Sequence, residues 1–262
     1  MATGAISVGN EYLFGKGKVM LLERDANGVV SEGLYVGNCP ELRFSSAAEK
    51  LKHFESMTGT NAQDREIITQ ITMEMSVTLE SIADETLAVL VWGETNAIAA
   101  AAAQSHFFPS GITNGQTHII PNAWNITSPV LKDSAGSPAT VDSADYQLDT
   151  DFGSIKFVDV TGYTQPFELE YDKGAAVGIP LLKTTQPQRF LRFEGKNLGN
   201  PGLSYADTFI VELYNIGFDP PADIGFIGTE FARFELKGSI NADDTRSDDS
   251  SLGAYGRIIK IT

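Results

Sequence analysis

The sequence has few of the residues from which disulfide frameworks and metal sites are built. Its single cysteine, Cys39, excludes an intramolecular disulfide, so a reducing compartment is the expected place of folding. The three histidines, His53, His106 and His118, lie far apart and beside no cysteine or spaced pair of carboxylates. Because a zinc site needs several ligands at close range, we expect neither a bound metal nor any other cofactor.

Basic residues are also scarce. The chain has 19 lysines and arginines against 34 aspartates and glutamates, which gives a formal net charge of −15. Binding to a nucleic-acid backbone depends on basic side chains that displace counterions, so this balance argues against a nucleic-acid-binding protein. The acidity is compatible with a surface that nucleic acid passes without adhering, although acidity alone usually serves solubility.

Long apolar runs are missing as well. No stretch of about 18 apolar residues occurs, so no membrane span is expected. The N-terminal residues lack a basic segment followed by an apolar segment, so no signal peptide is expected either.

Patterns of catalytic sites are not found. There is no G-x-S-x-G nucleophile elbow, and residues 15–18 (G-K-G-K) precede a predicted strand instead of the helix N-terminus that binds phosphate. The acidic segment from Asp243 to Asp249 lacks the spacing and the glycine of an EF-hand, so a solvated loop is the favoured interpretation. No catalytic residue is predicted, and the chain is not expected to be an enzyme.

The composition instead favours a mainly β protein. Hydrophobic residues make up 42% of the chain, enough for a substantial core, and the 15 phenylalanines and 8 tyrosines suit pleated sheets. The 25 glycines and 11 prolines separate short periodic runs, as the turns of an antiparallel β protein require.

The clearest pattern is a long alternation of apolar and polar residues over 66–80. It predicts a strand with one buried and one wet face, about twice the usual strand length. Two interpretations stay open: a half-solvated sheet of an ordinary sandwich, which periodicity alone favours, and the wall of a water-filled barrel or channel. The apolar side carries Ile71, Met73, Met75, Val77 and Leu79, and the polar side carries Gln70, Thr72, Glu74, Ser76, Thr78 and Glu80.

Further strands are predicted before and after this one. The last but one, at 230–240, carries a second polar stripe: Ala232, Phe234, Leu236 and Ile240 are expected to face inward, and Arg233, Glu235, Lys237 and Ser239 outward. The predicted strands of this pattern span 17–23, 33–36, 41–45, 189–194, 207–218, 230–240 and 256–261.

One amphipathic helix is predicted at 81–92, with Ser81 as its N-cap and Gly93 at its end. The Ala-rich segment 97–104 is a weaker helix candidate. Residues 46–65 form a connection longer than a compact domain needs, whose first part is either a short helix or an extended arm. The expected apolar face of the helix holds Ile82, Leu87, Leu90 and Val91.

The pattern changes between residues 111 and 180. Short strands, predicted at 117–120, 146–148, 154–158 and 166–171, alternate there with loops rich in serine, aspartate, glycine and proline. We therefore predict a discontinuous large domain, residues 1–110 and 181–262, interrupted by a small β-sandwich-like domain at 111–180.

The order of several motifs resembles that of the tail tube proteins of long-tailed bacteriophages. The resemblance covers about residues 15–105 and 182–262, and the segment 111–180 is similar to an insertion that some members carry. Thr86 stands where that family often has asparagine. The motifs are G-K-G-K-V-M-L-L-E (15–23), G-L-Y-V-G-N-C-P-E-L-R-F (33–44), E-K-L-K-H-F-E-S (49–56), the long strand, E-T-L-A-V-L-V-W-G (85–93) and Q-R-F-L-R-F-E-G (188–195).

The resemblance implies a β-sandwich or half-barrel subunit with one flanking helix, assembled into hexameric rings. Rings stack head-to-tail into a filament, and the long strands complete an inner β-barrel. Such a tube encloses a tape measure protein during assembly in the host cytoplasm, meets tail terminator and distal tail proteins, and conducts the genome from the virion into the host.

On this interpretation the polar strand faces line the lumen, where acidic side chains repel DNA phosphates. The 46–65 connection becomes the arm between rings, since a polar segment too long for its own domain can order against a partner. The expected lumen residues are Gln70, Thr72, Glu74, Ser76, Thr78 and Glu80, with Arg233, Glu235 and Lys237 facing the lumen or a neighbour; the expected arm residues are Glu49, Lys50, Lys52, His53, Phe54 and Glu55.

Two other functions stay open. One is the related tube of a contractile tail, which would need a sheath partner. The other is a virion decoration or carbohydrate-binding module, in which the 111–180 domain binds through Trp124, Tyr146, Phe152 and Tyr163, although these aromatics could equally pack its core.

Overall fold

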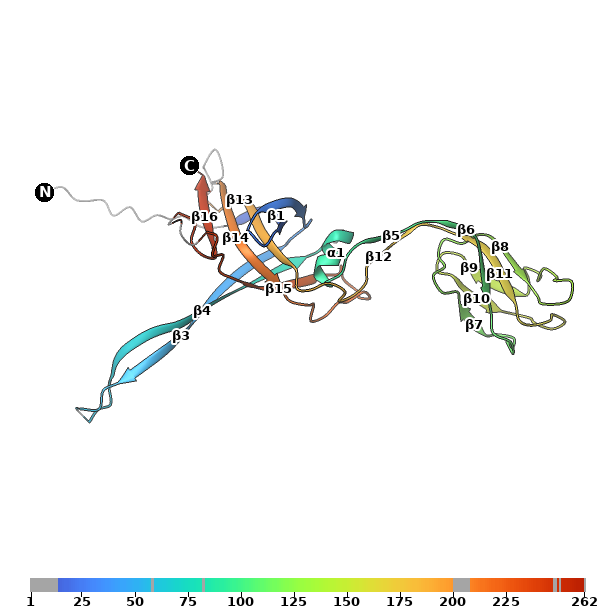
Figure 1. Ribbon diagram of the computed structural model, residues 1–262, viewed down its shortest axis with the longest axis horizontal. Helices are drawn as coiled ribbons and strands as arrows, with labels where there is room; N and C mark the ends of the chain where they lie inside the picture. The colour runs from blue at the N-terminus through green and yellow to red at the C-terminus, as the bar shows by residue number, and fades with distance from the viewer. Residues whose placement is uncertain are drawn as a thin grey trace. The chain divides into compact units, whose positions relative to one another are not determined.

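The computed structural model describes residues 14–57, 59–81, 83–199, 208–246, 249 and 251–261 (Figure 1). Strands make up 50% and helix 3%, which confirms the prediction of a mainly β protein. The described residues fall into two compact units. The large unit lies within Met1–Thr95 and Ile179–Thr262, and the small unit is Asn96–Gly178.

An antiparallel sheet of eight strands forms the large unit. Its order is β2-β1-β13-β14-β15-β4-β3, and β16 pairs with β14 beside this path. The strand β14 therefore has two neighbours on one side: residues 208–213 pair with β16, and residues 216–218 pair with β15. The strands are β1 (Gly15–Arg24), β2 (Val30–Tyr35), β3 (Glu41–Phe54), β4 (Gln63–Leu79), β13 (Gln188–Asn197), β14 (Thr208–Phe218), β15 (Phe234–Ile240) and β16 (Gly256–Ile261).

The core of the large unit takes the inward residues of these strands. The only helix among the described residues, α1 (Asp84–Leu90), adds Val89 and Leu90 to the same core. The helix begins at Asp84, so the predicted cap by Ser81 is wrong; Ala83 precedes the helix and makes no side-chain hydrogen bond to it. Ile82 lies outside the described residues.

The residue that follows the end of α1 must be glycine, because another segment of the chain passes close to it. Trp92, with φ of 53°, takes the left-handed conformation that often ends a helix. Gly93 follows, and its N–H donates a hydrogen bond of 2.8 Å to the carbonyl of Ala88. A Cβ atom on Gly93 would lie 2.4 Å from the carbonyl oxygen of Pro180, so a larger residue would push this returning segment away.

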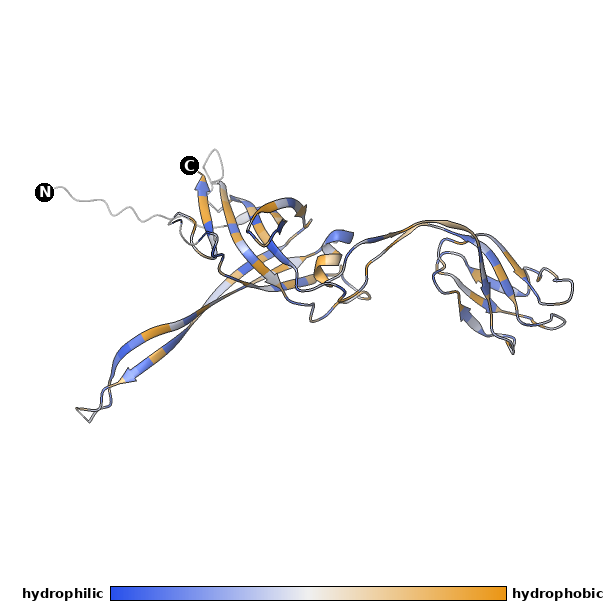
Figure 2. Ribbon diagram, in the orientation of Figure 1, coloured by the Kyte–Doolittle hydropathy of each residue, from blue (hydrophilic) through white to orange (hydrophobic). Residues whose placement is uncertain are grey.

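The 46–65 connection is the outer part of a long hairpin. The strand β3 continues to Phe54 instead of ending at Ser45, and its partner β4 begins at Gln63. The arm interpretation therefore applies and the helix interpretation is wrong: the backbone of 47–54 obtains its hydrogen bonds from β4. Figure 2 shows bands of hydrophobic and hydrophilic residues along both strands.

The strand predicted at 230–240 begins only at Phe234. From there burial alternates as expected: Phe234, Leu236, Gly238 and Ile240 are buried, and Glu235, Lys237 and Ser239 are exposed. Ala232, expected to face inward, is exposed, because residues 219–233 form an irregular loop between β14 and β15.

The small unit is a pair of three-stranded sheets around its own core, of which Leu131, Ile155 and Leu169 are fully buried. It begins at Asn96 and not at 111, because the Ala-rich segment predicted as a helix forms strands. One sheet has the order β6-β11-β8 and the other β7-β10-β9, while β5 pairs with β12; the strands are β5 (Asn96–Ile98), β6 (Ala101–Phe107), β7 (Thr117–Ile119), β8 (Thr127–Lys132), β9 (Tyr146–Asp149), β10 (Ser154–Phe157), β11 (Glu168–Lys173) and β12 (Ala176–Gly178).

No helix in the described part of the chain has the length and hydrophobicity that crossing a membrane would require.

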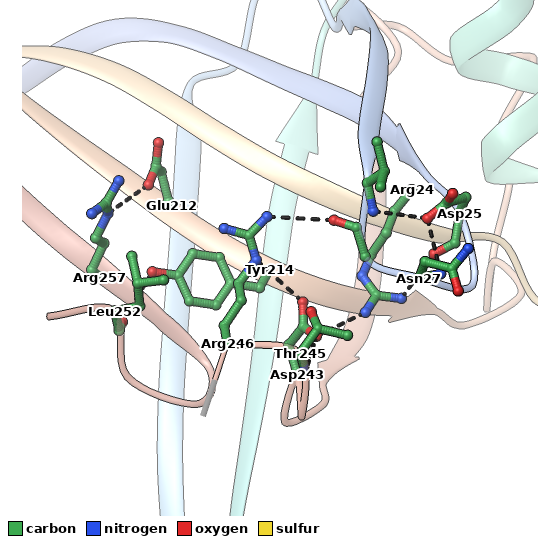
Figure 3. Close-up of polar contacts among 12 residues, drawn as sticks. Arg24, Asp25, Asn27, Glu212, Tyr214, Asp243, Thr245, Arg246, Leu252 and Arg257 are labelled. Atoms are coloured by element: carbon green, nitrogen blue, oxygen red, sulfur yellow. Dashed lines mark hydrogen bonds and ion pairs between the residues drawn. The ribbon is translucent and has the colours of Figure 1, made fainter. Parts of the chain in front are cut away.

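Buried charges join the loop after β15 to the end of β1 (Figure 3). Asp243, with 1% of its side chain exposed, forms ion pairs with Arg24 at 3.0 Å and with Arg246 at 3.4 Å. Arg246 also lies 4.6 Å from the centre of the Tyr214 ring. The expectation that the 243–249 segment is a solvated loop is therefore wrong for Asp243, while Asp248 lies outside the described residues.

The Asp243 carboxylate stays ionised in this environment. Burial alone would raise its pKa, but hydrogen bonds from Thr245 and Arg24 outweigh burial and lower the pKa below its ordinary value of 3.8. A second nearly buried carboxylate, Glu212, pairs with Arg192 and Arg257, both at 2.7 Å.

We predict that Asp243→Asn lowers the free energy of unfolding by about 3 kcal/mol, because Arg24, which is nearly buried, and Arg246, which is half-buried, both lose their counter-charge. Urea unfolding at pH 7 measures the change. Asp249→Asn, in the same loop but exposed, is the matched control and should change stability by less than about 1 kcal/mol.

The difference between wild type and Asp243→Asn should also depend on pH. Since the folded-state pKa of Asp243 is lowered, its stabilisation is complete above the ordinary value of 3.8 and is lost as the pH falls through the folded-state pKa. The two unfolding curves should therefore converge in acid. A difference that stays constant down to the acid transition would contradict this role.

Candidate functional site

Three adjacent strands, β15, β4 and β3, present one continuous polar face. Residues paired across antiparallel strands project to the same side of the sheet. The rows across this face are Glu235, Thr78 and Glu41; then Lys237, Ser76 and Arg43; then Ser239, Glu74 and Ser45.

The opposite face of β15 and β4 belongs to the core, whereas on β3 Leu42 is half-buried and Phe44 is 46% exposed. Met75, Val77 and Leu79 of β4 are buried, and Leu236 of β15 lies beside them with 1% exposure. This agrees with the alternation predicted for β4. Ile71 is the exception, since it was expected to be buried but is 50% exposed, because the core ends near Met73.

The predicted lumen residues of β4 therefore share one side of the sheet. Thr72 and Glu74 are exposed and Ser76 and Thr78 are half-buried, while Glu80 follows directly after the strand. Gln70, farther along, is paired with Glu49. Whether this face meets a lumen remains a prediction.

The cations on this face are paired with carboxylates of the same face. Lys237 lies 3.0 Å from Glu235, and Arg233 lies 3.0 Å from Glu80. The third cation, Arg43, pairs with Glu41. Such exposed pairs contribute at most about 1 kcal/mol to stability, so their consequence is local neutralisation of charge.

The carboxylates of Glu49 and Glu74 have no ion-pair partner among the described residues. The face is therefore less acidic than β4 alone suggests, but its unpaired charges are negative. The sequence analysis missed Glu41, Arg43 and Ser45, because a single amino-acid sequence does not reveal which residues of β3 pair with which residues of β4. The weak alternation along 41–49 was the available signal.

The part of the eight-stranded sheet formed by β15, β4 and β3 has an open edge at each lateral end. In the described part of the chain, no strand pairs with the outer edge of β3, Glu41–Phe54. On the other side, β15 pairs with β14 only at residues 238–240, so residues 234–236 also lack a strand partner there. Open edges with unpaired N–H and C=O groups are ready to pair with another strand.

Beyond the core, β3 and β4 continue as a two-stranded ribbon. We call residues 47–57 and 59–72 the distal ribbon; within the described part of the chain, its two strands pair only with each other (Figure 1). An ion pair joins Lys50 to Glu66 across it, and the Nδ1 atom of His53 lies 2.6 Å from a carboxylate oxygen of Asp64. The predicted arm residues Glu49, Lys50, Lys52, His53, Phe54 and Glu55 all lie in the distal ribbon.

The distal ribbon exposes apolar side chains on both of its faces. Ile67 and Ile68 are consecutive residues of β4, so their side chains project to opposite sides; they pair with Leu51 and Lys50, beyond a register shift between Glu49 and Lys50. A two-stranded hairpin is marginally stable alone in water. The exposed fractions are Leu51 62%, Phe54 47%, Met57 92%, Ile67 60%, Ile68 54% and Ile71 50%.

The aromatic residues considered for carbohydrate binding do not form an open platform. The Trp124 indole N–H donates a 2.9 Å hydrogen bond to the carbonyl of Gly174, and the Tyr163 hydroxyl donates one of 2.7 Å to Asp145. Tyr146 packs against the small unit's core. Phe152 is the exposed one of the four, at 79%.

The described residues contain no group of three or more His, Cys, Asp or Glu side chains that could hold a metal ion.

Comparison with known proteins gives one family. The family model described as "Protein of unknown function UCP028589" matches residues 12–259, and the chain belongs to this family. The matched range includes both units. No curated protein matches the chain.

We predict that limited trypsin digestion of the isolated subunit cuts the distal ribbon first, after Lys52 or Arg65. Among the described residues the ribbon has no third strand, and it buries little apolar surface, so it opens at a low free energy. Mass spectrometry of early fragments identifies the sites. Arg192, in the central strand β13, is the internal control and should stay uncut; an early cut there, with the ribbon intact, would contradict the expectation.

Proposed function

We propose that this family member is the structural subunit of a tube, of the kind that tail tube proteins of long-tailed bacteriophages form. One observation carries the proposal: the sheet β15-β4-β3 has a polar face, an apolar face that the core covers on β15 and β4, and two open edges. Copies of such a sheet can pair side by side without bringing new apolar surface into water.

Pairing of β3 in one copy with β15 in the next would close the sheets into a ring. Closure into a barrel removes the open edges of every copy. The polar face then lines the lumen, because the opposite face is held by Val77, Leu79 and Leu236 in the core. A hexamer is the ring size that the tail-tube resemblance suggests.

A lumen of this kind would let DNA pass without retaining it. Its cations are already paired, so a phosphate finds no free basic side chain there, and the unpaired Glu49 and Glu74 repel it. In a tail, the tube would surround a tape measure protein, join terminator and distal tail proteins, and belong to the virion after assembly in the host cytoplasm.

A decoration or carbohydrate-binding module has less support. Trp124 and Tyr163 are engaged in hydrogen bonds within the small unit, and no second exposed aromatic accompanies Phe152 among the four candidates. The tube of a contractile tail would share the ring and the lumen, and a sheath partner would distinguish it.

The first prediction of this proposal concerns the assembled state. Negative-stain images of the purified full chain, concentrated at low and high salt, should show rings or tubes with an open centre. Sedimentation velocity measures the fraction assembled. A protein that stays monomeric under all assembly conditions would overturn the proposed function.

The second concerns the lumen. Glu74→Lys places an unpaired cation on the polar face, so assembled tubes should retain a short DNA duplex at about 50 mM salt and release it by about 200 mM. Glu32→Lys is the matched control, since it makes the same charge change on the exposed side of β2. Equal retention by both variants would show that Glu74 does not face the lumen.

A further inference from the structure

The loop between β14 and β15 exposes large apolar side chains. In residues 219–233, Phe226 is 78% exposed, Ile227 100% and Phe231 95%. Surface of this kind, gathered in one segment, marks a site of contact with another molecule.

This loop and the distal ribbon lie at opposite ends of the same strands. The loop enters β15 at Phe234, which pairs with Leu79 at one end of β4. The ribbon leaves the sheet at the other end, where Ile240 pairs with Met73 (Figure 1). A copy placed in line with the first would therefore bring its ribbon to the loop.

The loop borders a hollow of about 950 Å³ on the polar side of β15. Glu235 and Lys237, which project from the polar face, line the hollow together with Phe226 and Phe231 of the loop. Its volume lies in the range of cavities that bury a drug-sized ligand, so the side chains of a hairpin tip can enter it.

The unpaired charges of the loop are negative, and those of the distal ribbon between Glu49 and the tip are positive. In the loop, Asp219, Asp223 and Glu230 have no ion-pair partner among the described residues. In the distal ribbon, Lys52 and Arg65 have none, and neither has Glu49 at its base, whereas Lys50 pairs with Glu66. An acidic, apolar hollow at one end thus complements a ribbon with free cations and exposed Phe54 and Met57 at the other.

We propose that the 219–233 loop is the binding site for the distal ribbon of a second copy of this chain. The proposal rests on the proposed tube and goes beyond it by naming the receiving surface. The contact joins two different surfaces, so it repeats without closing and builds a filament. It is distinct from the edge pairing of β3 with β15, which closes the ring.

Charge reversal tests the contact on the full chain. A ribbon variant carries Lys52→Glu and Arg65→Glu, and a loop variant carries Asp223→Lys and Glu230→Lys. Each alone should form rings but need at least about tenfold more protein than wild type to form tubes, because like charges now face each other. Rings of the two variants, prepared separately and mixed, should form tubes again, since every new contact is then attractive.

A control variant carries Lys156→Glu and Lys196→Glu at exposed residues of β10 and β13. It has the same change of net charge as the ribbon variant and should form tubes like wild type. Negative-stain imaging and sedimentation velocity report rings and tubes separately. Tubes formed equally well by the ribbon variant, or no recovery on mixing, would overturn the inference and leave the proposed function standing. A wild type without rings or tubes would overturn both.

Discussion

The hydrogen-bonding of β4 is the constraint on which the rest of the large unit depends. This strand pairs with β3 along its length and with β15 over residues 73–79, so its side chains alternate between two fixed sides. One side completes the core and the other forms the polar face. Where β15 ends, the same pairing continues without a third strand and produces the distal ribbon. The polar face, the open edges and the distal ribbon thus all follow from the lengths over which β3 and β15 pair with β4.

Much of this unit could be predicted from local patterns. Period-two alternation identified Val77 and Leu79 as buried and Glu74 as exposed, because a pleated strand imposes that period whatever its partners. Which strands pair with one another could not be predicted from these local patterns. The extension of β3 to Phe54 depends on β4, and the Ala-rich segment is extended because β11 and β12 supply hydrogen bonds that outweigh the helix propensity of alanine.

The errors at the candidate site have the same origin. The face of β4 looked acidic when considered alone, but the register brings Arg43 and Lys237 into the row of Ser76, and Arg233 meets Glu80 across the sheet. Asp243 looked solvated because its loop is rich in aspartate, yet Arg24, distant in sequence, encloses it. Charges balanced by tertiary neighbours cannot be counted from one segment.

The position of the small unit in the chain sets an order in time. The strands β1 to β4 precede residues 96–178, and β13 to β16, which complete the sheet, follow them. During synthesis the ribosome must therefore produce the whole small unit before β4 can meet β15. Until then Met75, Val77 and Leu79 lack the part of their core that β13 to β16 supply, and the nascent β3–β4 hairpin carries an apolar stripe that its final partners have yet to cover.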